Sequence, residues 1–163
     1  MINAGLMSSG SGDWNTPEPV LKLVRRIDKI RLDPCSNGGS IVGAAVEWSV
    51  EVNGLAQPWT SRRKGLVYVN PPYGRAVGDW IEKIRHEASA GVEVVALLPA
   101  RTDAKWWHQH VFQTAAAVCF WKGRLSFLGA PSSAPFPSAV AYWGKRSTLF
   151  HTVFMQAGKV VLL

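Results

Sequence analysis

The apolar positions along the chain follow two patterns, one with helical spacing and one with short continuous runs. Residues 20–27 place apolar side chains on one helix face. Thr16 before them is typical of an N-cap, and Pro17 is typical of a first helical position. The same spacing predicts further helices over residues 77–90 and 105–114.

Short apolar runs bounded by turn residues predict the strands. They lie at 30–32, 48–52, 66–69, 92–98, 116–121 and 138–143, and a final hairpin is expected over 149–155 and 159–163. Because strands and helices alternate through most of the chain, the pattern predicts an α/β fold. Its sheet is expected to be mostly parallel, with an antiparallel end.

The length and composition fit one globular domain. The chain has 163 residues, of which 47% are hydrophobic and 18% are charged. Residues 1–12 end in a run of Ser and Gly and predict a flexible N-terminal segment. Residues 13–163 are then expected to form a single domain.

The segment Asn70-Pro71-Pro72-Tyr73 is the most informative part of the sequence. It directly follows the apolar run at 66–69. The two prolines end the strand, since neither has an N–H group for the sheet and each holds the preceding residue extended. Asn70 is therefore expected at the carboxyl edge of a strand, where open α/β sheets bind ligands. A side-chain amide, fixed carbonyls and a ring suit a flat molecule that has an NH2 group.

Asp33 ends an earlier strand and is followed by a turn of small residues. In a doubly wound sheet Asp33 and Asn70 would open onto the same edge, where a cofactor and a substrate can meet. An ordinary turn beginning at Asp33-Pro34 is the alternative interpretation. For Tyr73 the alternative is packing in the core.

The charge balance favours a polyanionic partner. Eighteen Lys and Arg against eleven Asp and Glu give a net charge of +7. Cys35 and Cys119 are too few for a zinc site or a disulfide scaffold, and His108 and His110 have no Cys nearby, so no metal is expected. The sequence shows no apolar run of membrane-spanning length and no signal-peptide pattern, so a cytoplasmic protein without membrane contact is expected.

Several segments together resemble a known family. Asn70-Pro71-Pro72-Tyr73 is similar to the catalytic motif of amino-methyltransferases that use S-adenosylmethionine. Other segments occur around it in the order expected for the phage-type DNA N6-adenine methyltransferases: Asp13-Trp14-Asn15-Thr16-Pro17, Leu32-Asp33-Pro34-Cys35-Ser36, Gly54-Leu55 with Trp59, and Leu98-Pro99-Ala100-Arg101-Thr102-Asp103. The resemblance spans roughly Trp14 to Trp143.

This resemblance implies a single-domain, Rossmann-like methyltransferase fold and methylation of DNA adenine at N6. It also implies a phage or prophage protein in a bacterial cell, with a role in protecting DNA from restriction. The catalytic residues implied are Asn70, Pro71, Pro72 and Tyr73. The Asn70 side-chain carbonyl and the Pro71 backbone carbonyl would accept the two N6–H groups, and Tyr73 would stack on the flipped base. No metal would take part.

The resemblance also implies where S-adenosylmethionine binds, with S-adenosylhomocysteine as the product. Its methionine end would lie beside Trp14, Thr16 and Pro17, and the first cofactor loop would comprise Asp33, Pro34, Cys35 and Ser36. This loop departs from the usual glycine-rich pattern, because no G-x-G precedes the acid. An acid about 20 residues further on is expected at the ribose. Glu51 is nearest and Glu47 competes with it, and either can be a surface carboxylate.

Basic residues near these segments are candidates for DNA contacts, although charged runs are usually solvated faces. The principal candidates are Arg62, Arg63, Arg75, Arg101 and Lys105, followed by Lys64, Lys122 and Arg124. A salt bridge between Arg101 and Asp103 is the alternative for Arg101. The loops at 57–64 and 122–137 are candidates for base reading.

Other functions stay open at this stage. The same chemistry can methylate cytosine N4, an RNA base or a glutamine amide in a protein. A DNA-binding module without catalytic activity is an alternative from another class. The oligomeric state is not predicted, and a monomer is compatible with the sequence.

Overall fold

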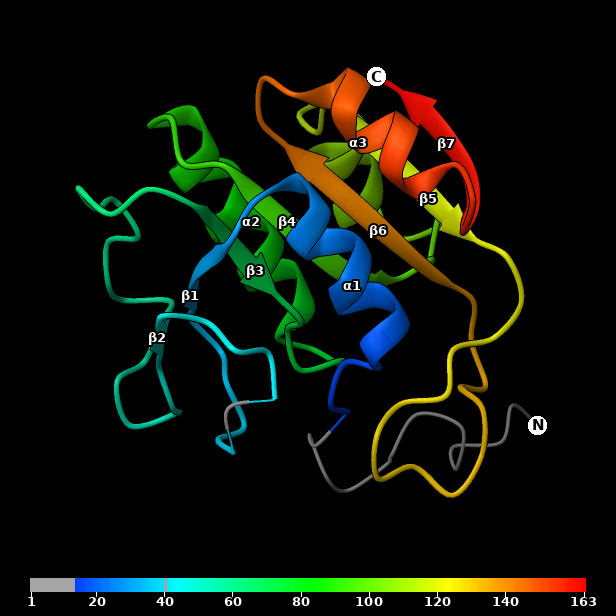
Figure 1. The fold of residues 1–163 in the computed structure, drawn as a ribbon, viewed down its shortest axis with the longest axis horizontal. Coiled ribbons are helices and arrows are strands. Elements are labelled where there is room, and N and C mark those ends of the chain that lie inside the picture. The colour runs from blue at the N-terminus through cyan, green and yellow to red at the C-terminus, as the bar shows by residue number, and fades with distance from the viewer. Residues whose placement is uncertain (1–13, 40) are drawn as a thin grey trace.

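A mixed β-sheet forms the centre of the protein (Figure 1). The computed structural model describes residues 14–39 and 41–163, so the predicted flexible segment 1–12 lies outside the described residues. Within the described chain, seven strands lie side by side in the order β2-β1-β3-β4-β6-β5-β7. Their bounds are β1 Ile30–Asp33, β2 Val46–Glu47, β3 Leu66–Val69, β4 Val94–Pro99, β5 Ala117–Trp121, β6 Ser138–Trp143 and β7 Gly158–Leu162.

The sheet has a parallel half and an antiparallel half. Strands β2, β1, β3 and β4 run parallel to one another. Strands β6, β5 and β7 are each antiparallel to their neighbours. The predicted mixture of helices and strands and the antiparallel end are confirmed. Among the described strands, however, parallel and antiparallel pairs are equal in number, because β6 inserts between β4 and β5 and runs against both.

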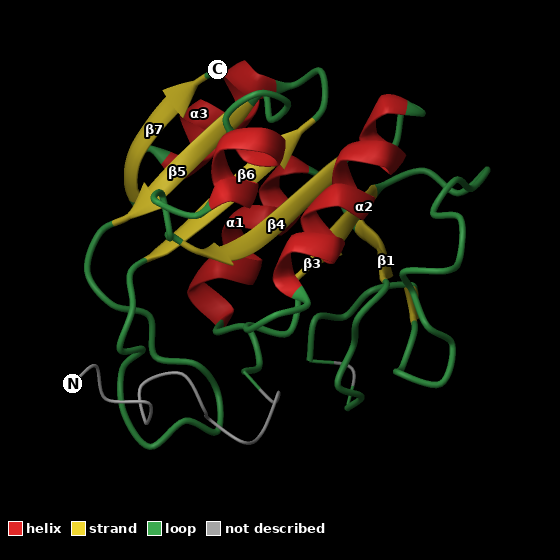
Figure 2. Ribbon diagram, turned by 180° about the vertical axis from the view of Figure 1, so that it is seen from behind, coloured by secondary structure: helices red, strands yellow, loops and turns green. Residues whose placement is uncertain are grey.

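Helices cover both faces of this sheet. Helices α1 (Glu18–Ile27) and α3 (Ser147–Phe154) lie in front of it in Figure 1. Helix α2 (Val77–Ser89) lies on the opposite face, which Figure 2 shows from behind. The π-helical turn η2 (Trp107–Val111) contributes Trp107 to the core on the side of α2. The domain therefore has three layers, with an apolar core on each side of the sheet.

Strand β4 shows how the sequence divides its side chains between the two cores. Val95 and Leu97 belong to the core that contains α1 and α3, whereas Ala96 and Leu98 belong to the core that contains α2. Successive side chains of a strand point to opposite faces, so a strand covered on both sides reads as a continuous apolar run. The predicted strands at 66–69, 92–98, 116–121 and 138–143 match β3, β4, β5 and β6 closely.

Two predicted strands are wrong. Residues 48–52 form a loop that ends in a turn at 50–52, because the chain leaves the sheet after the short strand β2 at Val46–Glu47. The first arm of the predicted terminal hairpin, 149–155, is mostly helical. Phe150, Val153 and Phe154 are buried there at helical spacing, and only the second arm pairs, as β7 on β5.

The start of the first helix also differs from the prediction. Helix α1 begins at Glu18, Pro17 is its N-cap, and no side chain caps it. The Thr16 hydroxyl instead hydrogen bonds to the Tyr68 hydroxyl at 2.8 Å. The predicted helix over 105–114 has a π-helical centre at Trp107–Val111, whereas the predicted helix over 77–90 is confirmed.

The loop between β2 and β3 is anchored beneath α2 by Trp59. This side chain is 1% exposed, and its ring N–H donates to the Gly54 carbonyl at 2.9 Å. The Trp59 backbone N–H donates to Glu87 on α2 at 3.0 Å, and Arg31 donates to the Trp59 carbonyl at 2.7 Å. The segment Gly54-Leu55 with Trp59, which supported the resemblance, thus fixes this loop against the sheet.

Gly54 lies so close to Pro34 that a larger residue there is expected to destabilise the protein. A Cβ atom added there would lie 2.1 Å from the Pro34 carbonyl oxygen, so the two turns cannot both keep their positions. We expect Gly54→Ala to lower the free energy of unfolding by about 1–3 kcal/mol, measured by urea denaturation. Gly78→Ala is the matched control. Its Cβ would lie 4.0 Å from Trp106, in ordinary contact, and Ala favours the helix. Equal stability of the two variants would contradict this interpretation.

Candidate active site

The carboxyl ends of β1 and β3 meet at one edge of the sheet. These strands are neighbours, and the chain continues from β1 to β2 on one side and from β3 to β4 on the other. Such a divergence opens a crevice at the carboxyl edge of parallel strands. Asp33 ends β1 and Asn70 follows β3. The structure therefore brings together the two residues that the sequence placed at strand ends.

The side-chain amide of Asn70 is held in one orientation by the segment before α1. Its Nδ2 donates to the Trp14 carbonyl at 2.6 Å and to the Thr16 hydroxyl at 3.3 Å. The Thr16 hydroxyl is itself fixed by Tyr68, a buried residue of β3. These bonds assign the nitrogen side of the amide, so the opposite atom, Oδ1, is the free acceptor.

The Asn70 Oδ1 atom is buried and has no hydrogen-bond partner among the described residues. A buried acceptor without a partner costs about 1–3 kcal/mol. Its position beside an oriented amide makes it a ready acceptor for an N–H group from a ligand. This is the chemistry that the sequence assigned to Asn70.

Cys35 joins the turn after β1 to the turn after β3. Its backbone N–H donates to Asp33 Oδ1 at 3.1 Å, and its thiol donates to the Asn70 carbonyl at 3.3 Å. Burial and the nearby Asp33 hold the pKa of this thiol well above its ordinary value. Cys35 is therefore a neutral spacer that sets the separation of the two turns.

Asp33 is almost fully buried, with 4% of its surface exposed. Burial raises the pKa of its carboxyl to about 7, because the desolvation of the charged form outweighs the hydrogen bond from Cys35. The negative charge of Glu47 acts in the same direction. The site thus contains a carboxyl that is poised to ionise near neutral pH, and a cation beside it would favour the ionised form.

Glu47 ends β2 directly beside Asp33, its partner in the sheet register. Ser36 donates its hydroxyl to Glu47 Oε2 at 3.1 Å, while Oε1 is buried without a partner among the described residues. Glu51 lies instead on the exposed turn that follows, where its carboxylate accepts a hydrogen bond from the Ser49 hydroxyl. Of the two acids considered from the sequence, Glu47 is therefore the one that is bonded to the turn after β1.

A cavity of about 320 Å³ opens between these turns. Its walls come from the turn after β1, the loop after β2 and the segment after β3, and they include Pro34, Cys35, Ser36, Asn37, Ser49, Val50, Asn53, Gly54, Leu55, Asn70, Pro72 and Trp80. A smaller pocket on the other side of Asn70 is lined by Trp14, Thr16 and Asp33. The larger cavity has the size and the mixed lining of a small-molecule site.

Tyr73 belongs to a cluster of aromatic side chains beside this cavity. Its ring lies edge-on to Phe127, at 6.2 Å between centroids, and to Phe136, at 5.3 Å. Trp14 contacts the same two rings at 5.1 and 5.7 Å. Both phenylalanines lie in the loop between β5 and β6. Tyr73 is therefore packed, as the alternative interpretation expected, and its stacking on a base stays a prediction.

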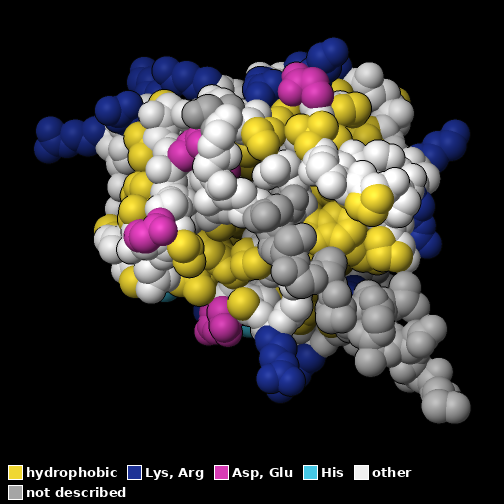
Figure 3. Space-filling model, turned by 90° about the horizontal axis from the view of Figure 1, so that it is seen from below, with side chains coloured by type: hydrophobic (Ala, Val, Ile, Leu, Met, Phe, Trp, Pro, Cys, Tyr) yellow, Lys and Arg dark blue, Asp and Glu magenta, His cyan; other side chains and the backbone are white. Residues whose placement is uncertain are grey.

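Phe127 and Phe136 were not singled out from the sequence. The only sequence signal for them is their place in the loop 122–137, which was a candidate for base reading. The backbone N–H of Leu128 in this loop donates to the Asn15 carbonyl at 3.0 Å, so the loop contacts the segment that orients Asn70. Figure 3 looks onto this edge of the sheet and shows hydrophobic side chains around the centre of the face, with Lys and Arg at its rim.

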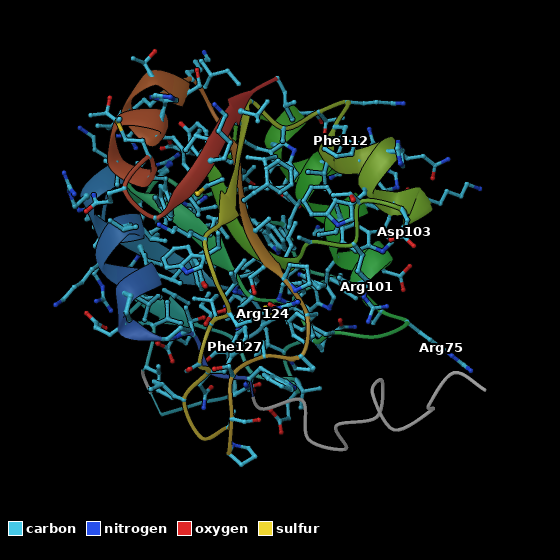
Figure 4. All side chains as sticks on the ribbon, turned by 90° about the vertical axis from the view of Figure 1, so that its right-hand side faces the viewer. Arg75, Arg101, Asp103, Phe112, Arg124 and Phe127 are labelled. Atoms are coloured by element: carbon cyan, nitrogen blue, oxygen red, sulfur yellow. The ribbon has the colours of Figure 1, made fainter. Side chains whose placement is uncertain are left out.

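The candidate DNA-contacting residues fall at two opposite edges of the sheet. Arg75 follows Tyr73, and Arg101 follows β4 at the same carboxyl edge. Figure 4 shows Arg75 pointing away from the body of the protein. Lys105 is exposed in the segment after Arg101. Arg62 and Arg63 precede β3 and therefore lie at the amino edge, away from Asn70. The five residues do not form one surface.

The described residues contain neither a metal-binding cluster nor a membrane-spanning helix. Within residues 14–39 and 41–163, no group of three or more His, Cys, Asp and Glu side chains could hold a metal ion. No described helix has both the length and the apolar character needed to cross a membrane.

Comparison with known proteins assigns the chain to a family. No curated protein and no solved structure matches it. The model of one family, described as DNA N-6-adenine-methyltransferase (Dam), matches residues 5–151. This range contains Asp33, Asn70 and the aromatic cluster, together with every strand except β7. The chain belongs to the DNA N-6-adenine-methyltransferase (Dam) family.

Proposed function

We propose that this protein transfers a methyl group from S-adenosylmethionine to N6 of an adenine in DNA. The family gives the DNA adenine methyltransferase class. The observation that supports the mechanism is the buried, unpartnered Oδ1 of Asn70 beside Asp33. An oriented acceptor at the edge where β1 and β3 diverge is what activation of an amino group requires.

The adenine amine is a poor nucleophile, because its lone pair is delocalised into the ring. Asn70 Oδ1 and the Pro71 carbonyl would each accept one N6–H, which localises the lone pair on nitrogen. Both acceptors are fixed before the substrate arrives, so they stabilise the positive charge that develops on nitrogen without reorganising. Bound S-adenosylmethionine would supply the methyl group, whose C–S bond would break as the N–C bond forms, and the methylated nitrogen would then lose one proton to water.

The residues around the 320 Å³ cavity fit the cofactor. Glu47 does not line the cavity itself, but it accepts a hydrogen bond from Ser36, which does. Its Oε1 is a buried acceptor without a partner among the described residues, and it suits the ribose hydroxyls. Asp33 suits the cationic methionine end, because a positive charge would favour its ionised form. Thr16 hydrogen bonds to Tyr68 and Asn70, so its role in the proposal is to orient the catalytic amide. This arrangement supports binding of the cofactor at the carboxyl edge of the sheet, as in Rossmann-like folds.

The aromatic cluster is the proposed site for the target base. Adenine must leave the duplex to reach Asn70, and a flipped base is commonly held against aromatic rings. Tyr73, Phe127 and Phe136 contact one another, with ring centroids 5.3 to 6.4 Å apart. Arg75 and Arg101 on the same edge are the proposed phosphate contacts, since they flank the catalytic segment.

A labelled-methyl assay tests the proposal. Purified protein, S-adenosylmethionine labelled in the methyl group and duplex DNA of mixed sequence are expected to give labelled N6-methyladenine. Nucleoside analysis after digestion identifies the product. Label on cytosine, or transfer only when RNA or a glutamine-containing protein replaces the DNA, would replace the proposed acceptor. DNA binding without any methyl transfer would indicate an inactive module.

The catalytic role of Asn70 is tested by Asn70→Ala. Loss of one preorganised acceptor is expected to lower kcat by about 10²–10³-fold. Because Asn70 is one of twelve described residues that line the cofactor cavity, binding of S-adenosylhomocysteine should change by much less, which calorimetry measures. Gln109→Ala, at an exposed position of η2, is the control for both measurements. A kcat near that of the control would exclude the proposed role.

The raised pKa of Asp33 predicts a pH-dependent affinity for S-adenosylhomocysteine, which carries the same methionine ammonium. Below about pH 7 the carboxyl is protonated, and the pairing with the ammonium is lost. The affinity is then expected to fall by up to about tenfold per pH unit as the pH drops through this range, as measured by calorimetry. In Asp33→Asn the affinity should be low and nearly independent of pH. An unchanged pH profile in this variant would contradict the assignment.

A further inference from the structure

The edge of the sheet opposite to Asn70 has a surface of basic residues that the proposed mechanism does not use. Lys29 precedes β1, the run Arg62-Arg63-Lys64 precedes β3, Arg85 lies near the end of α2, and Lys145 follows β6. All of these segments meet the amino ends of the parallel strands or the carboxyl end of β6. We name this surface the amino-edge belt, and it consists of Lys29, Arg62, Arg63, Lys64, Arg85 and Lys145.

Two adjacent hollows in the protein surface connect the residues of the belt. One, of about 600 Å³, is lined by Arg85 and Lys145, and the other, of about 330 Å³, is lined by Arg63 and Lys64. They share the wall formed by residues 91–93. Lys29 adjoins the second hollow, because its carbonyl accepts a hydrogen bond from Leu66 at 3.0 Å.

The acids at this edge are bound by basic residues outside the belt, Arg146 and Lys83. Glu93 accepts two hydrogen bonds from Arg146, at 2.5 and 3.0 Å, and Asp28 accepts one at 2.9 Å. Glu87 is paired with Lys83 at 2.5 Å. Within the described part of the chain, none of the six belt residues forms an ion pair with a carboxylate. The belt therefore keeps its positive charge for an external anion.

The lining of the hollows favours phosphate over bases. Trp143 is the one aromatic residue among those that line the two hollows. It is 2% exposed and its ring N–H donates to Thr114 at 2.9 Å, so its ring offers no surface for stacking. A groove that reads single-stranded bases needs such rings. A belt of guanidinium and ammonium groups without them contacts the sugar–phosphate backbone, whatever the sequence.

The length of the strands separates this belt from the catalytic edge. Strand β4 has six residues, which is about 20 Å at roughly 3.3 Å per residue. A straight duplex whose target base is at Asn70 would lie across the carboxyl edge and would not reach the far end of β4. The belt itself spans β1, β3, β4 and β6, about 15 Å at the usual strand spacing. Over that length a duplex carries about nine phosphate charges, counted on both strands.

We propose that the amino-edge belt binds the phosphate backbone of a second segment of duplex DNA, without sequence preference. The inference rests on the proposed function in one respect, because it takes DNA as the common partner. A long DNA molecule can then occupy the catalytic edge and the belt together. The contact at the belt keeps the DNA bound after a methylated site leaves the catalytic edge. It therefore raises the effective concentration of further target sites on the same DNA. A short duplex cannot reach both surfaces at once, so the belt does not increase its affinity for the catalytic edge.

A pair of matched variants tests the proposal. Arg63→Ala with Lys64→Ala removes two charges from the belt. Lys22→Ala with Arg26→Ala removes one Lys and one Arg from exposed positions of α1, so the net charge changes equally. Affinity for a duplex of several hundred base pairs is measured over a range of salt concentrations. The slope of log K against log salt is expected to fall by about 2 in the belt variant and to stay unchanged in the α1 variant.

Methylation and cross-linking separate this proposal from the proposed function. On a duplex of about 12 base pairs, the belt variant is expected to methylate at the rate of the α1 variant. A photo-cross-linker attached to Arg63→Cys is expected to label long DNA. At an equimolar ratio of protein to short duplex it should label much less, because the short duplex then occupies the catalytic edge. Equal salt slopes for the two variants, or loss of short-duplex methylation in the belt variant, would overturn the proposal. If no methyl transfer occurs at all, the slope and the cross-link still decide whether the belt binds DNA.

Discussion

The candidate active site depends on the hydrogen bonds that orient the Asn70 amide. The Trp14 carbonyl and the Thr16 hydroxyl accept from Nδ2, and Tyr68 fixes the Thr16 hydroxyl. With the nitrogen side occupied, Oδ1 faces the crevice as an unpartnered acceptor. The two prolines after Asn70 keep the chain extended, so the amide cannot move away from this edge. The proposed chemistry follows from this fixed orientation, and the cofactor cavity and the aromatic cluster are arranged around it.

Much of this arrangement could be predicted from the sequence, because it depends on local patterns. A buried strand followed by Asn-Pro-Pro-Tyr places Asn70 at a strand end, and Asp33 does the same for β1. The interpretation of Thr16 shows the limit of local patterns. Its type and position fit an N-cap, but its hydroxyl bonds to Tyr68, a residue 52 positions away. Similarly, the helical spacing of Phe150, Val153 and Phe154 extends over little more than one turn, and their burial depends on the packing of α3 against α1 and β5.

The contrast between Glu47 and Glu51 illustrates a second limit. Counting about 20 residues from the first acid favours Glu51, but strand β2 is only two residues long and ends at Glu47. The acid proposed for the ribose is the one at the end of the strand. Its position in the sequence depends on where the chain leaves the sheet. The basic residues show the same effect. Arg62 and Arg75 are close in sequence, yet β3 runs between them and separates them to opposite edges.

The hydrogen bonds to Asn70 also bear on how the protein reaches its active form. They join residues 56 and 54 positions apart, and the Thr16–Tyr68 bond joins residues 52 apart. Contacts of such long sequence separation form only after a large loop has closed, and they carry its entropy cost. The amide is therefore oriented only once α1 has docked on the sheet. A partly folded chain can have β3 and its prolines in place and still lack the geometry for catalysis. Activity thus reports on completed folding of the domain, from its first helix to its central strands.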